Sequence, residues 1–229
     1  MDICLIPARS GSKRIKNKNI INFFGSPMIS YSIKTALKSK LFDKIFVSTD
    51  SKKIAKISKN YGAEIPFLRP KKLANDYASD NSVIKHFVDF AKKQSLNVRF
   101  LCYIYPVNPL LKISTLKKCK KLLLKSKSQK VLTVGKYSYP IQKALKKNKI
   151  SGNIIFKENS SNKKKSQDLE THYHDAAQCY WFDLRKVRNT ADTKIKTQAI
   201  LLKNFEFLDV DTNEDLVNLE KIYKHKLQK

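Results

Sequence analysis

The sequence predicts an α/β fold in which a mostly parallel sheet is covered by helices on both faces. Two observations lead to this expectation: strand-like and helix-like segments alternate along most of the 229 residues, and the hydrophobic content of 41% is that of a globular chain. A chain of this length fits one domain. We therefore expect a single domain over 1–229 that is interrupted by an insertion at about 137–178.

The first strand and helix are expected near the N-terminus. An apolar strand runs over 3–7 and stops at Pro7, which has no N–H for a ladder. Ser26 and Pro27 are expected to open a helix as its N-cap and first residue. An apolar stripe at helical spacing in that helix consists of Met28, Ile29, Ile33, Ala36 and Leu37.

The next units follow the same rhythm. A strand is expected over 44–48, and a helix over 51–61 ends at Gly62. After a short extended segment at 65–68, Asp80 can cap a helix. The buried side of that helix carries Val83, Ile84, Phe87, Val88 and Phe90. We expect Asp50, at the end of the second strand, to cap the helix that follows it.

The middle of the chain completes the sheet and then loses the pattern. Strands are expected over 100–105 and 130–134, with a helix over 116–124 between them. From about 137 to 178 short polar runs replace the alternation, which indicates an inserted lobe or dimer arm.

The core is expected to resume after the insertion. Extended segments are predicted over 179–182 and 205–210. A last helix should cover 213–227 and begin with a capping box formed by Thr212 and Asp215.

Composition excludes several classes of protein. No apolar run approaches the roughly 20 residues needed to span a bilayer, and charge begins at Asp2, so we expect neither a signal peptide nor a membrane anchor. The four cysteines, at positions 4, 102, 119 and 179, contain no C-x-x-C pair. We expect buried free thiols in a cytoplasmic protein.

The formal net charge of +28 allows binding to polyanions. The lysines are nevertheless spread over nearly every predicted helix and loop, and the run 163–165 has the character of a solvated loop. No RNA-binding or DNA-binding motif is present, so a nucleic-acid-binding module remains a remote alternative. The same charge would attract small anionic substrates.

The loop after the first strand predicts a phosphate-binding site. Arg9 can bind two phosphate oxygens through its planar guanidinium, and Gly11 lets the backbone approach an anion. In open α/β sheets, ligands bind at loops outside the carboxyl ends of strands. The loop is neither a P-loop nor a dinucleotide motif, and a basic surface turn is the alternative. The candidate nucleotide-binding residues of this loop are Ala8, Arg9, Ser10, Gly11, Ser12, Lys13 and Asn19, with further charge from Arg14, Lys16 and Lys18.

A pair of carboxylates near the C-terminus predicts a Mg²⁺ site. Asp209 and Asp211 follow the apolar pair 207–208, so on a strand both would point to one side. Magnesium binds few carboxylates together with substrate phosphates. The alternative is that Asp211 helps to cap the last helix while Asp209 faces water.

Several of these motifs together resemble one family. The run 6–20, I-P-A-R-S-G-S-K-R-x-x-x-K-N-I, is similar to the signature loop of the sugar-acid cytidylyltransferases, which activate sialic acids, related nonulosonic acids and KDO as CMP derivatives. The order and spacing of the motifs match those of the family over nearly the whole chain. The other matching motifs lie at 47–50, 69–70, 73–76, 209–212 and 214–215.

The resemblance implies a Rossmann-like, three-layer nucleotide-diphospho-sugar transferase fold with an inserted dimerisation and acceptor segment. It implies CTP as substrate, catalytic Mg²⁺ on Asp209 and Asp211, and a homodimer. It also implies that Arg69, with backbone groups near Ala78, recognises cytosine; from spacing alone Arg69 could equally be an ordinary solvated arginine. The expected catalytic residues are Arg9, Lys13, Lys18 and Asp211.

The segment 166–181 mixes carboxylate, imidazole, amide and aromatic groups, a combination that suits a polyhydroxylated, amidated sugar acid. It resembles the acceptor region of the pseudaminic acid branch of the family, in which S-Q-D-L-E and Y-H-D-A-x-Q-x-Y-W recur. His172 and His174 could share a face of a strand, but no third metal ligand is evident nearby. The candidate acceptor-binding residues are Gln167, Asp168, His174, Asp175 and Gln178.

Two departures separate the chain from the sialic acid branch. That branch has Asn-Gly where 175–176 is Asp-Ala, and Gln-Pro-Thr-Ser-Pro where 105–109 is Tyr-Pro-Val-Asn-Pro. The run 138–142 also favours the pseudaminic branch. Legionaminic acid, sialic acid and KDO remain alternative acceptors, and no aspartate at this strand end offers a second metal site.

Overall fold

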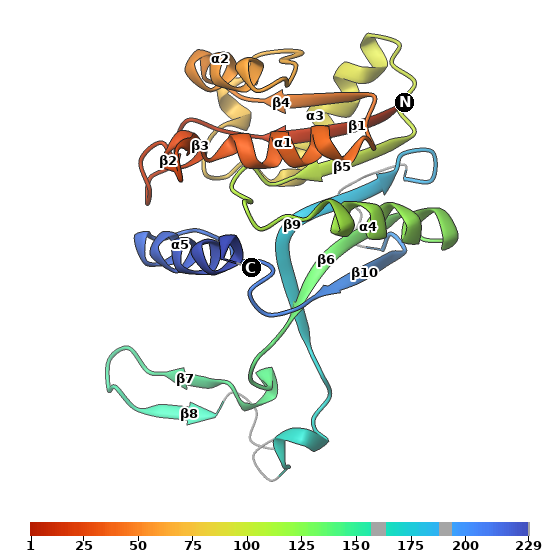
Figure 1. The fold of residues 1–229 in the computed structure, drawn as a ribbon. Helices are drawn as coiled ribbons and strands as arrows, with labels where there is room; N and C mark the ends of the chain where they lie inside the picture. Colours follow the sequence, from red (N-terminus) through yellow and green to blue (C-terminus); the bar gives the residue numbers. More distant parts are fainter. Residues whose placement is uncertain (157–163, 188–193, 229) are drawn as a thin grey trace.

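The computed structural model describes residues 1–156, 164–187 and 194–228 and confirms the α/β fold (Figure 1). Its main sheet has the strand order β10-β6-β9-β5-β1-β4, and all neighbours are parallel except that β9 runs antiparallel to β5 and β6. The strands are β1 (Asp2–Pro7), β4 (Lys44–Ser48), β5 (Phe100–Ile104), β6 (Lys130–Lys136), β9 (Tyr173–Asp183) and β10 (Thr197–Leu202).

Helices cover both faces of the sheet because alternate side chains of β1 enter two different cores. Cys4 and Ile6 pack on one face, against a core to which α1, α2 and α4 contribute. Ile3 and Leu5 pack on the other face, mainly against α3. Buried Leu219 places α5 on a third cluster beside the sheet. The helices are α1 (Ile29–Ser39), α2 (Lys52–Asn60), α3 (Asp80–Lys93), α4 (Ile113–Lys125) and α5 (Asn213–Leu227).

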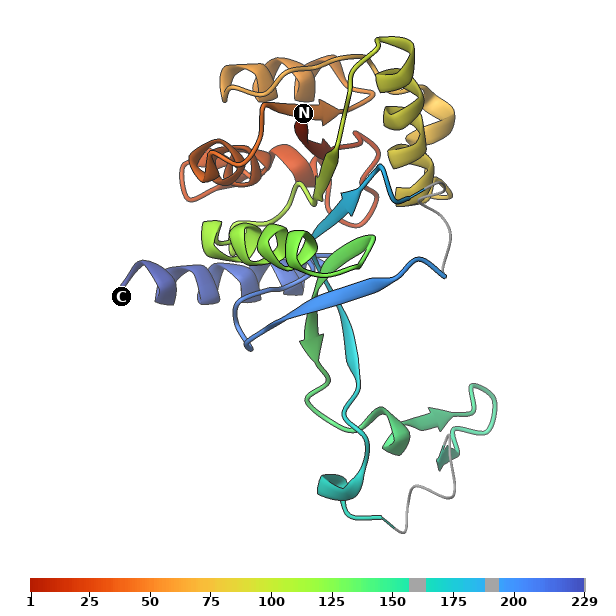
Figure 2. The same ribbon diagram turned by 90° about the vertical axis from the view of Figure 1, so that its right-hand side faces the viewer.

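The chain between β6 and β9 forms an arm that extends away from the body in both views (Figures 1 and 2). Its described part contains the 3-10 turns η3 (Ile141–Lys143) and η5 (Ser166–Asp168) and the hairpin of β7 (Leu145–Lys147) with β8 (Ile154–Phe156). The run 163–165 lies partly outside the described residues. Strand β9 begins at Tyr173, inside the range predicted for the insertion.

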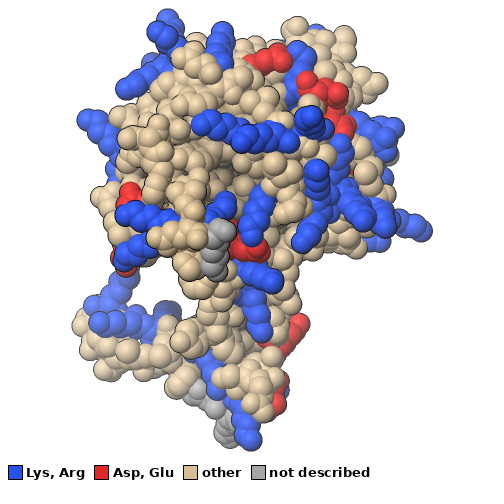
Figure 3. Space-filling model, in the orientation of Figure 1, with Lys and Arg blue, Asp and Glu red and all other residues tan. Residues whose placement is uncertain are grey.

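Other sequence-based expectations hold for the described residues. The last helix begins with the capping box of Thr212 and Asp215, and the four cysteines are free and buried. No described helix is both long and apolar enough to cross a bilayer. On the face in Figure 3, lysines and arginines are scattered over body and arm rather than gathered in one patch.

The predicted start of the first helix is wrong. Ser26–Pro27 forms a short strand, β3, paired with β2 (Asn22–Phe23), and α1 begins only at Ile29. The hairpin is possible because Phe24 and Gly25 both have positive φ, at 46° and 77°, as tight hairpin turns require.

The two predicted aspartate caps are also wrong. The Ser79 hydroxyl accepts the N–H of Ser82 at 3.3 Å and caps α3, while Ser51 caps α2. A serine precedes each helix by one position and fits the cap geometry. Asp50 and Asp80 are therefore free to bind other groups.

The segment 205–210 is not a strand, contrary to expectation. The last strand of the sheet is β10, upstream of it, which pairs with β6. A turn from Glu206 N to Lys203 O and a positive φ of 67° at Phe205 stop the extended run. The Phe207 ring then packs on Gly135, where a Cβ would overlap it. This contact fixes the path of the chain toward Asp209.

Strand β9 contains a bulge that sequence reasoning missed. Leu132 pairs with Tyr180 and Val134 with Asp175, so residue 133 of β6 faces 176–179 of β9. At its centre Ala177 has φ 47°, and its N–H donates to the Asp175 carboxylate at 2.8 Å. Alanine is strained in this left-handed conformation, whereas glycine is not.

We therefore expect Ala177→Gly to raise the free energy of unfolding by roughly 0.5–1 kcal/mol, because relief of strain outweighs the added freedom of the unfolded chain. Urea denaturation would measure this. The control is Ala176→Gly, at a buried neighbour without positive φ, which should lower stability. Equal losses in both variants would contradict the role assigned to the backbone of Ala177.

Candidate functional site

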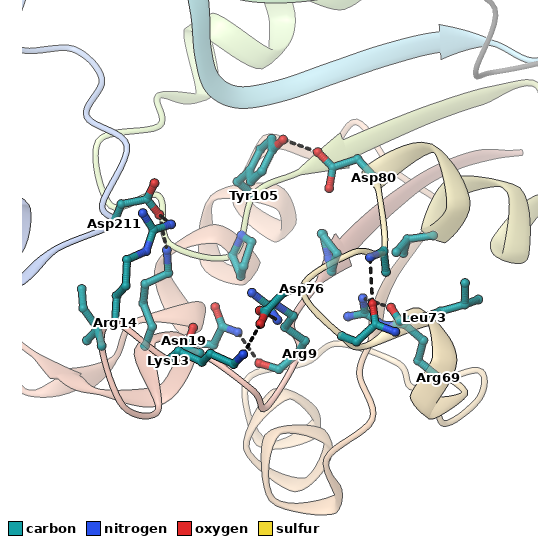
Figure 4. Close-up of a pocket in the computed structure, with 18 of the residues that line it drawn as sticks. Arg9, Lys13, Arg14, Asn19, Arg69, Leu73, Asp76, Asp80, Tyr105 and Asp211 are labelled. Atoms are coloured by element: carbon teal, nitrogen blue, oxygen red, sulfur yellow. Dashed lines mark hydrogen bonds and ion pairs between the residues drawn. The ribbon is translucent and has the colours of Figure 1, made fainter. Parts of the chain in front are cut away.

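A cavity of about 480 Å³ opens at the carboxyl ends of β1 and β5 (Figure 4). The loop after β1, the turn at 71–78 and the start of α3 surround it, and Asp211 enters from the chain before α5. The predicted site residues that line this cavity are Arg9, Ser12, Lys13, Lys18, Asn19, Arg69, Ala78 and Asp211. It lies at the sheet edge that the parallel topology predicts for a ligand.

The loop after β1 is held in shape by its polar side chains. The Asn19 amide donates to the Arg9 carbonyl at 2.8 Å, and Ser10 donates to the Asp50 carboxylate through its N–H, at 2.9 Å, and its hydroxyl. Burial raises the pKa of Asp50, but the hydrogen bonds from Ser10 outweigh it and the pKa lies below its usual value. Ser10 and Asp50 thus build the loop rather than line the cavity.

Ala8 and Gly11 contribute backbone only. Ala8 is fully buried, and its N–H donates to Ser48 O at 2.9 Å, which continues the β1 to β4 pairing into the loop. A Cβ at Gly11 would meet Ala74 O at 3.9 Å, an ordinary contact. The protein itself does not require glycine here, and close approach of an anion remains the reason expected for it.

Cations in the cavity are paired with two carboxylates. Asp76 contacts Arg9 at 2.5 Å and Lys13 at 2.7 Å. The hydrogen bond from Lys13, and next the one from Arg9, lower the pKa of Asp76. Asp211 contacts Arg14 at 2.8 Å and Lys18 at 3.4 Å. Ion pairs at such partly exposed positions are weak. An anionic ligand could therefore replace the carboxylates as the partner of these cations.

Arg69 does not project into solvent, which contradicts the interpretation as an ordinary solvated arginine. It is 5% exposed, and its guanidinium donates to the carbonyls of Ser48, at 2.7 Å, and Leu73, at 3.2 Å. Burial lowers the pKa of Arg69, and the negative charge of Asp50 opposes this. The side chain therefore ties the turn at 71–73 to the end of β4, while one edge lines the cavity.

Ala78 lies in the same wall. The Asn75 side-chain oxygen accepts the N–H groups of Tyr77 and Ala78, both at 2.9 Å, and shapes the chain before α3. Recognition of cytosine by Arg69 and the backbone near Ala78 remains a prediction.

Asp209 and Asp211 are close enough to influence each other, although no strand aligns them. Burial and then the Asp211 charge raise the pKa of Asp209, whose side chain nevertheless stays exposed. Asp211 lines the cavity, whereas Asp209 does not. The described residues include no group of three or more metal-ligating side chains. Two carboxylates beside a cavity lined by cations fit Mg²⁺, which takes its other ligands from phosphate and water.

The acceptor candidates do not converge on the cavity within one protomer. Gln167 and Asp168 lie in η5, at the far end of the arm (Figure 1). Gln178 is 2% exposed and donates to the Glu206 carbonyl at 2.7 Å, so its amide supports the chain before Asp209. His174 packs against Phe207 and Tyr137. Asp175 is joined to the cavity wall through Tyr180 and Tyr105, and the Gln178 carbonyl accepts the Tyr105 N–H at 3.1 Å.

Sequence reasoning missed other residues of the cavity. Asp80, Tyr103 and Tyr105 form one wall, and Asp76 pairs with its cations. Tyr103 and Tyr105 lie two residues apart at the end of β5. This spacing was a usable signal, because residues two apart in an extended chain share a face. Asp76 belongs to the run 73–76 that already carried the family resemblance.

Comparison with known proteins gives the family. The family model described as cytidylyltransferase matches residues 3–222, nearly all of the chain. The chain belongs to the cytidylyltransferase family. A pseudaminic acid cytidylyltransferase of Campylobacter jejuni subsp. jejuni serotype O:2 is 36% identical over 226 residues, which cover 97% of this chain and 96% of the relative.

Two further proteins show how far this cytidylyltransferase resembles others. A CMP-N,N'-diacetyllegionaminic acid synthase of Legionella pneumophila is 39% identical over 50% of each chain. The solved structure of CMP:2-keto-3-deoxy-manno-octonic acid synthetase complexed with CTP superimposes with a TM-score of 0.67 at 14% identity, over 99% of this chain and all of the other. That structure shares the fold, which confirms the predicted nucleotidyltransferase architecture.

The buried position of Arg69 makes it a test of cavity architecture. We expect Arg69→Lys to lower the free energy of unfolding by about 1–3 kcal/mol, because one ammonium cannot satisfy both carbonyls with the geometry of the guanidinium fork. Denaturant titration would measure the loss. The control, Arg99→Lys at an exposed position, should stay within about 0.5 kcal/mol of the parent. An Arg69 variant of unchanged stability would refute the tying role.

Proposed function

We propose that this cytidylyltransferase transfers the CMP group of CTP to a nonulosonic acid, most specifically pseudaminic acid. The observation that carries the proposal is a cavity at the carboxyl end of β1, in which Arg9, Lys13 and Lys18 surround space for a polyphosphate. The near full-length similarity to a pseudaminic acid cytidylyltransferase supports the choice of acceptor. Family membership favours this enzyme over the nucleic-acid-binding alternative.

The reaction needs positioning and charge neutralisation more than a strong base. The anomeric hydroxyl oxygen of the sugar acid forms a bond to the α-phosphorus of CTP, the bond from that phosphorus to the bridging oxygen of the β-phosphate breaks, and pyrophosphate leaves. Arg9 and Lys13 would release Asp76 and bind the phosphates, and Lys18 would offset the charge that develops on the leaving group. Ser12 and Asn19 supply neutral donors beside them.

Mg²⁺ is part of the proposal, with Asp209 and Asp211 as its protein ligands. When bound, the ion would neutralise phosphate charge and help the attacking hydroxyl to lose its proton. Arg14 and Lys18 already hold the Asp211 carboxylate at the cavity edge. Its second oxygen makes none of the contacts described for the chain and is open to a cation.

We further propose a homodimer in which the arm of one protomer reaches the cavity of its partner. The hairpin of the arm exposes apolar side chains that a lone protomer leaves in water: Leu145, Ile150, Ile154, Ile155 and Phe156 are 40–99% exposed. A partner would cover them, and it would explain why Gln167 and Asp168 lie far from their own cavity.

The proposed location is the cytoplasm. Four buried free thiols fit a reducing compartment, and the described helices include none that could anchor the chain in a bilayer. The alternative acceptors remain legionaminic acid, sialic acid and KDO. The partial similarity to a legionaminic acid enzyme supports the first of these.

Release of pyrophosphate from CTP in the presence of Mg²⁺ tests the reaction. Pseudaminic acid, legionaminic acid, N-acetylneuraminic acid and KDO are offered in parallel. We expect release with pseudaminic acid first. Asp211→Asn should lower kcat by at least about 100-fold, because loss of a charged ligand weakens stabilisation of the transition state by roughly 3 kcal/mol or more.

Two controls accompany that assay. Asp89→Asn removes a carboxylate whose ion pair, with Lys85 on α3, lies outside the cavity, and it should leave turnover unchanged. Chelation of Mg²⁺ should stop the parent enzyme. Silence with all four acids in folded protein would refute the proposed function, and full turnover of the Asp211 variant would refute the metal site.

The dimer is tested by molar mass in solution. Light scattering coupled to size-exclusion chromatography should give twice the 26.5 kDa of one chain. Ile155→Asp should shift the mass to a monomer and reduce turnover, because a charge would be buried in the interface. Leu124→Asp, at an exposed apolar residue of α4, is the matched control. A monomeric parent with full activity would contradict the dimer.

A further inference from the structure

A row of phenols and carboxylates begins at the cavity wall, where Figure 4 shows Tyr105 beside Asp80, and continues behind that wall to Tyr180 and Asp175. The Asp80 carboxylate accepts the Tyr103 hydroxyl at 2.6 Å with one oxygen and the Tyr105 hydroxyl with the other. The oxygens of Tyr105 and Tyr180 are 3.2 Å apart, and Tyr180 donates in turn to Asp175. The row thus connects α3, β5 and β9.

The row contains too few protons for its contacts. Three oxygen–oxygen contacts run from Asp80 through Tyr105 and Tyr180 to Asp175, and each needs one proton. The two phenols supply one proton each, and an ionised carboxylate supplies none. With both phenol protons directed at the carboxylates, the oxygens of Tyr105 and Tyr180 face each other with lone pairs only.

The neighbouring cation does not fill this gap. The Lys130 ammonium lies over the Tyr180 ring, 4.6 Å from its centroid, and balances charge near Asp80 and Asp175. It contacts the face of the ring rather than the phenol oxygen. The two phenol oxygens can therefore accept one further donor from outside the row, which water supplies in the free protein and a ligand can replace.

Access to the row is from the cavity. Tyr105 and Asp80 line it, whereas Tyr180 is only 8% exposed and does not line it, although its oxygen is 3.2 Å from that of Tyr105. The two carboxylates repel a phosphate or carboxylate group, which also has no proton to give. The chemistry of this wall selects a neutral group that carries an N–H or O–H.

We propose that Tyr105 and Tyr180 recognise the sugar acid by accepting one N–H or O–H donor of its hydroxyl or acetamido groups. This inference rests on the proposed function and assigns the two tyrosines to acceptor specificity, with Asp80 orienting Tyr105 and Asp175 orienting Tyr180. The cavity then has two ends. Its cations bind the triphosphate, and its donor-poor row binds the uncharged part of the sugar.

The test compares Michaelis constants for the two substrates. Tyr105→Phe keeps the ring and removes the hydroxyl, so KM for the sugar acid should rise roughly 2-fold to 12-fold, the value of one hydrogen bond, while KM for CTP stays within about 2-fold. Tyr180→Phe should do the same. Tyr31→Phe is the matched control, because its hydroxyl donates to the Phe23 carbonyl outside the cavity.

A change in the substrate makes the test specific. An acceptor analogue that lacks the donor, by deoxygenation or N-methylation of one group at a time, should bind the parent more weakly but lose nothing further in Tyr105→Phe. Unchanged acceptor KM in both tyrosine variants, or an equal rise in KM for CTP, would overturn the inference while the parent still turns over. Absence of turnover in the parent would instead overturn the proposed function, and the inference with it.

Discussion

Two ties to the carboxyl end of β4 hold the site together. Ser10 binds Asp50 just after this strand, and Arg69 binds the carbonyl of Ser48, its last residue. The first tie fixes the loop that carries the cations proposed to bind phosphate, and the second fixes the turn that carries Asp76. Each uses a charged group with several hydrogen bonds, which is stronger than a neutral bond and restricts geometry. Without these two ties, the loop and the turn would not be held in a fixed position relative to each other.

Cations and carboxylates occupy different regions of the cavity. Cations gather where the loop after β1 meets Asp76 and Asp211, so an incoming polyphosphate exchanges weak internal ion pairs for its own. Carboxylates and phenols gather at the start of α3 and along β5 and β9. The two regions share one cavity but attract different parts of the substrates, which would orient CTP and sugar acid relative to each other.

Much of the phosphate end could be predicted from sequence, because its residues lie in one short loop directly after a strand. Arg9, Lys13 and Lys18 needed no long-range information, and the structure brings them together. Residues defined by distant partners could not be assigned in this way. Asp50 and Asp80 follow the sequence pattern of helix caps, yet adjacent serines take that role and release both carboxylates for Ser10 and Tyr105.

The sequence by itself determined the alternation of strands and helices, the position of the basic loop that lines the cavity and the family, since each depends on local periodicity or on motifs contiguous in the chain. Only the tertiary structure decided that Arg69 is buried, that 205–210 is a turn held by Phe207 on Gly135, and that the acceptor candidates are divided between body and arm. Burial and pairing of this kind depend on contacts between residues far apart in sequence. The antiparallel insertion of β9 between β5 and β6 supplies some of these contacts, because the Gln178 amide of β9 donates to the Glu206 carbonyl and His174 packs on Phe207.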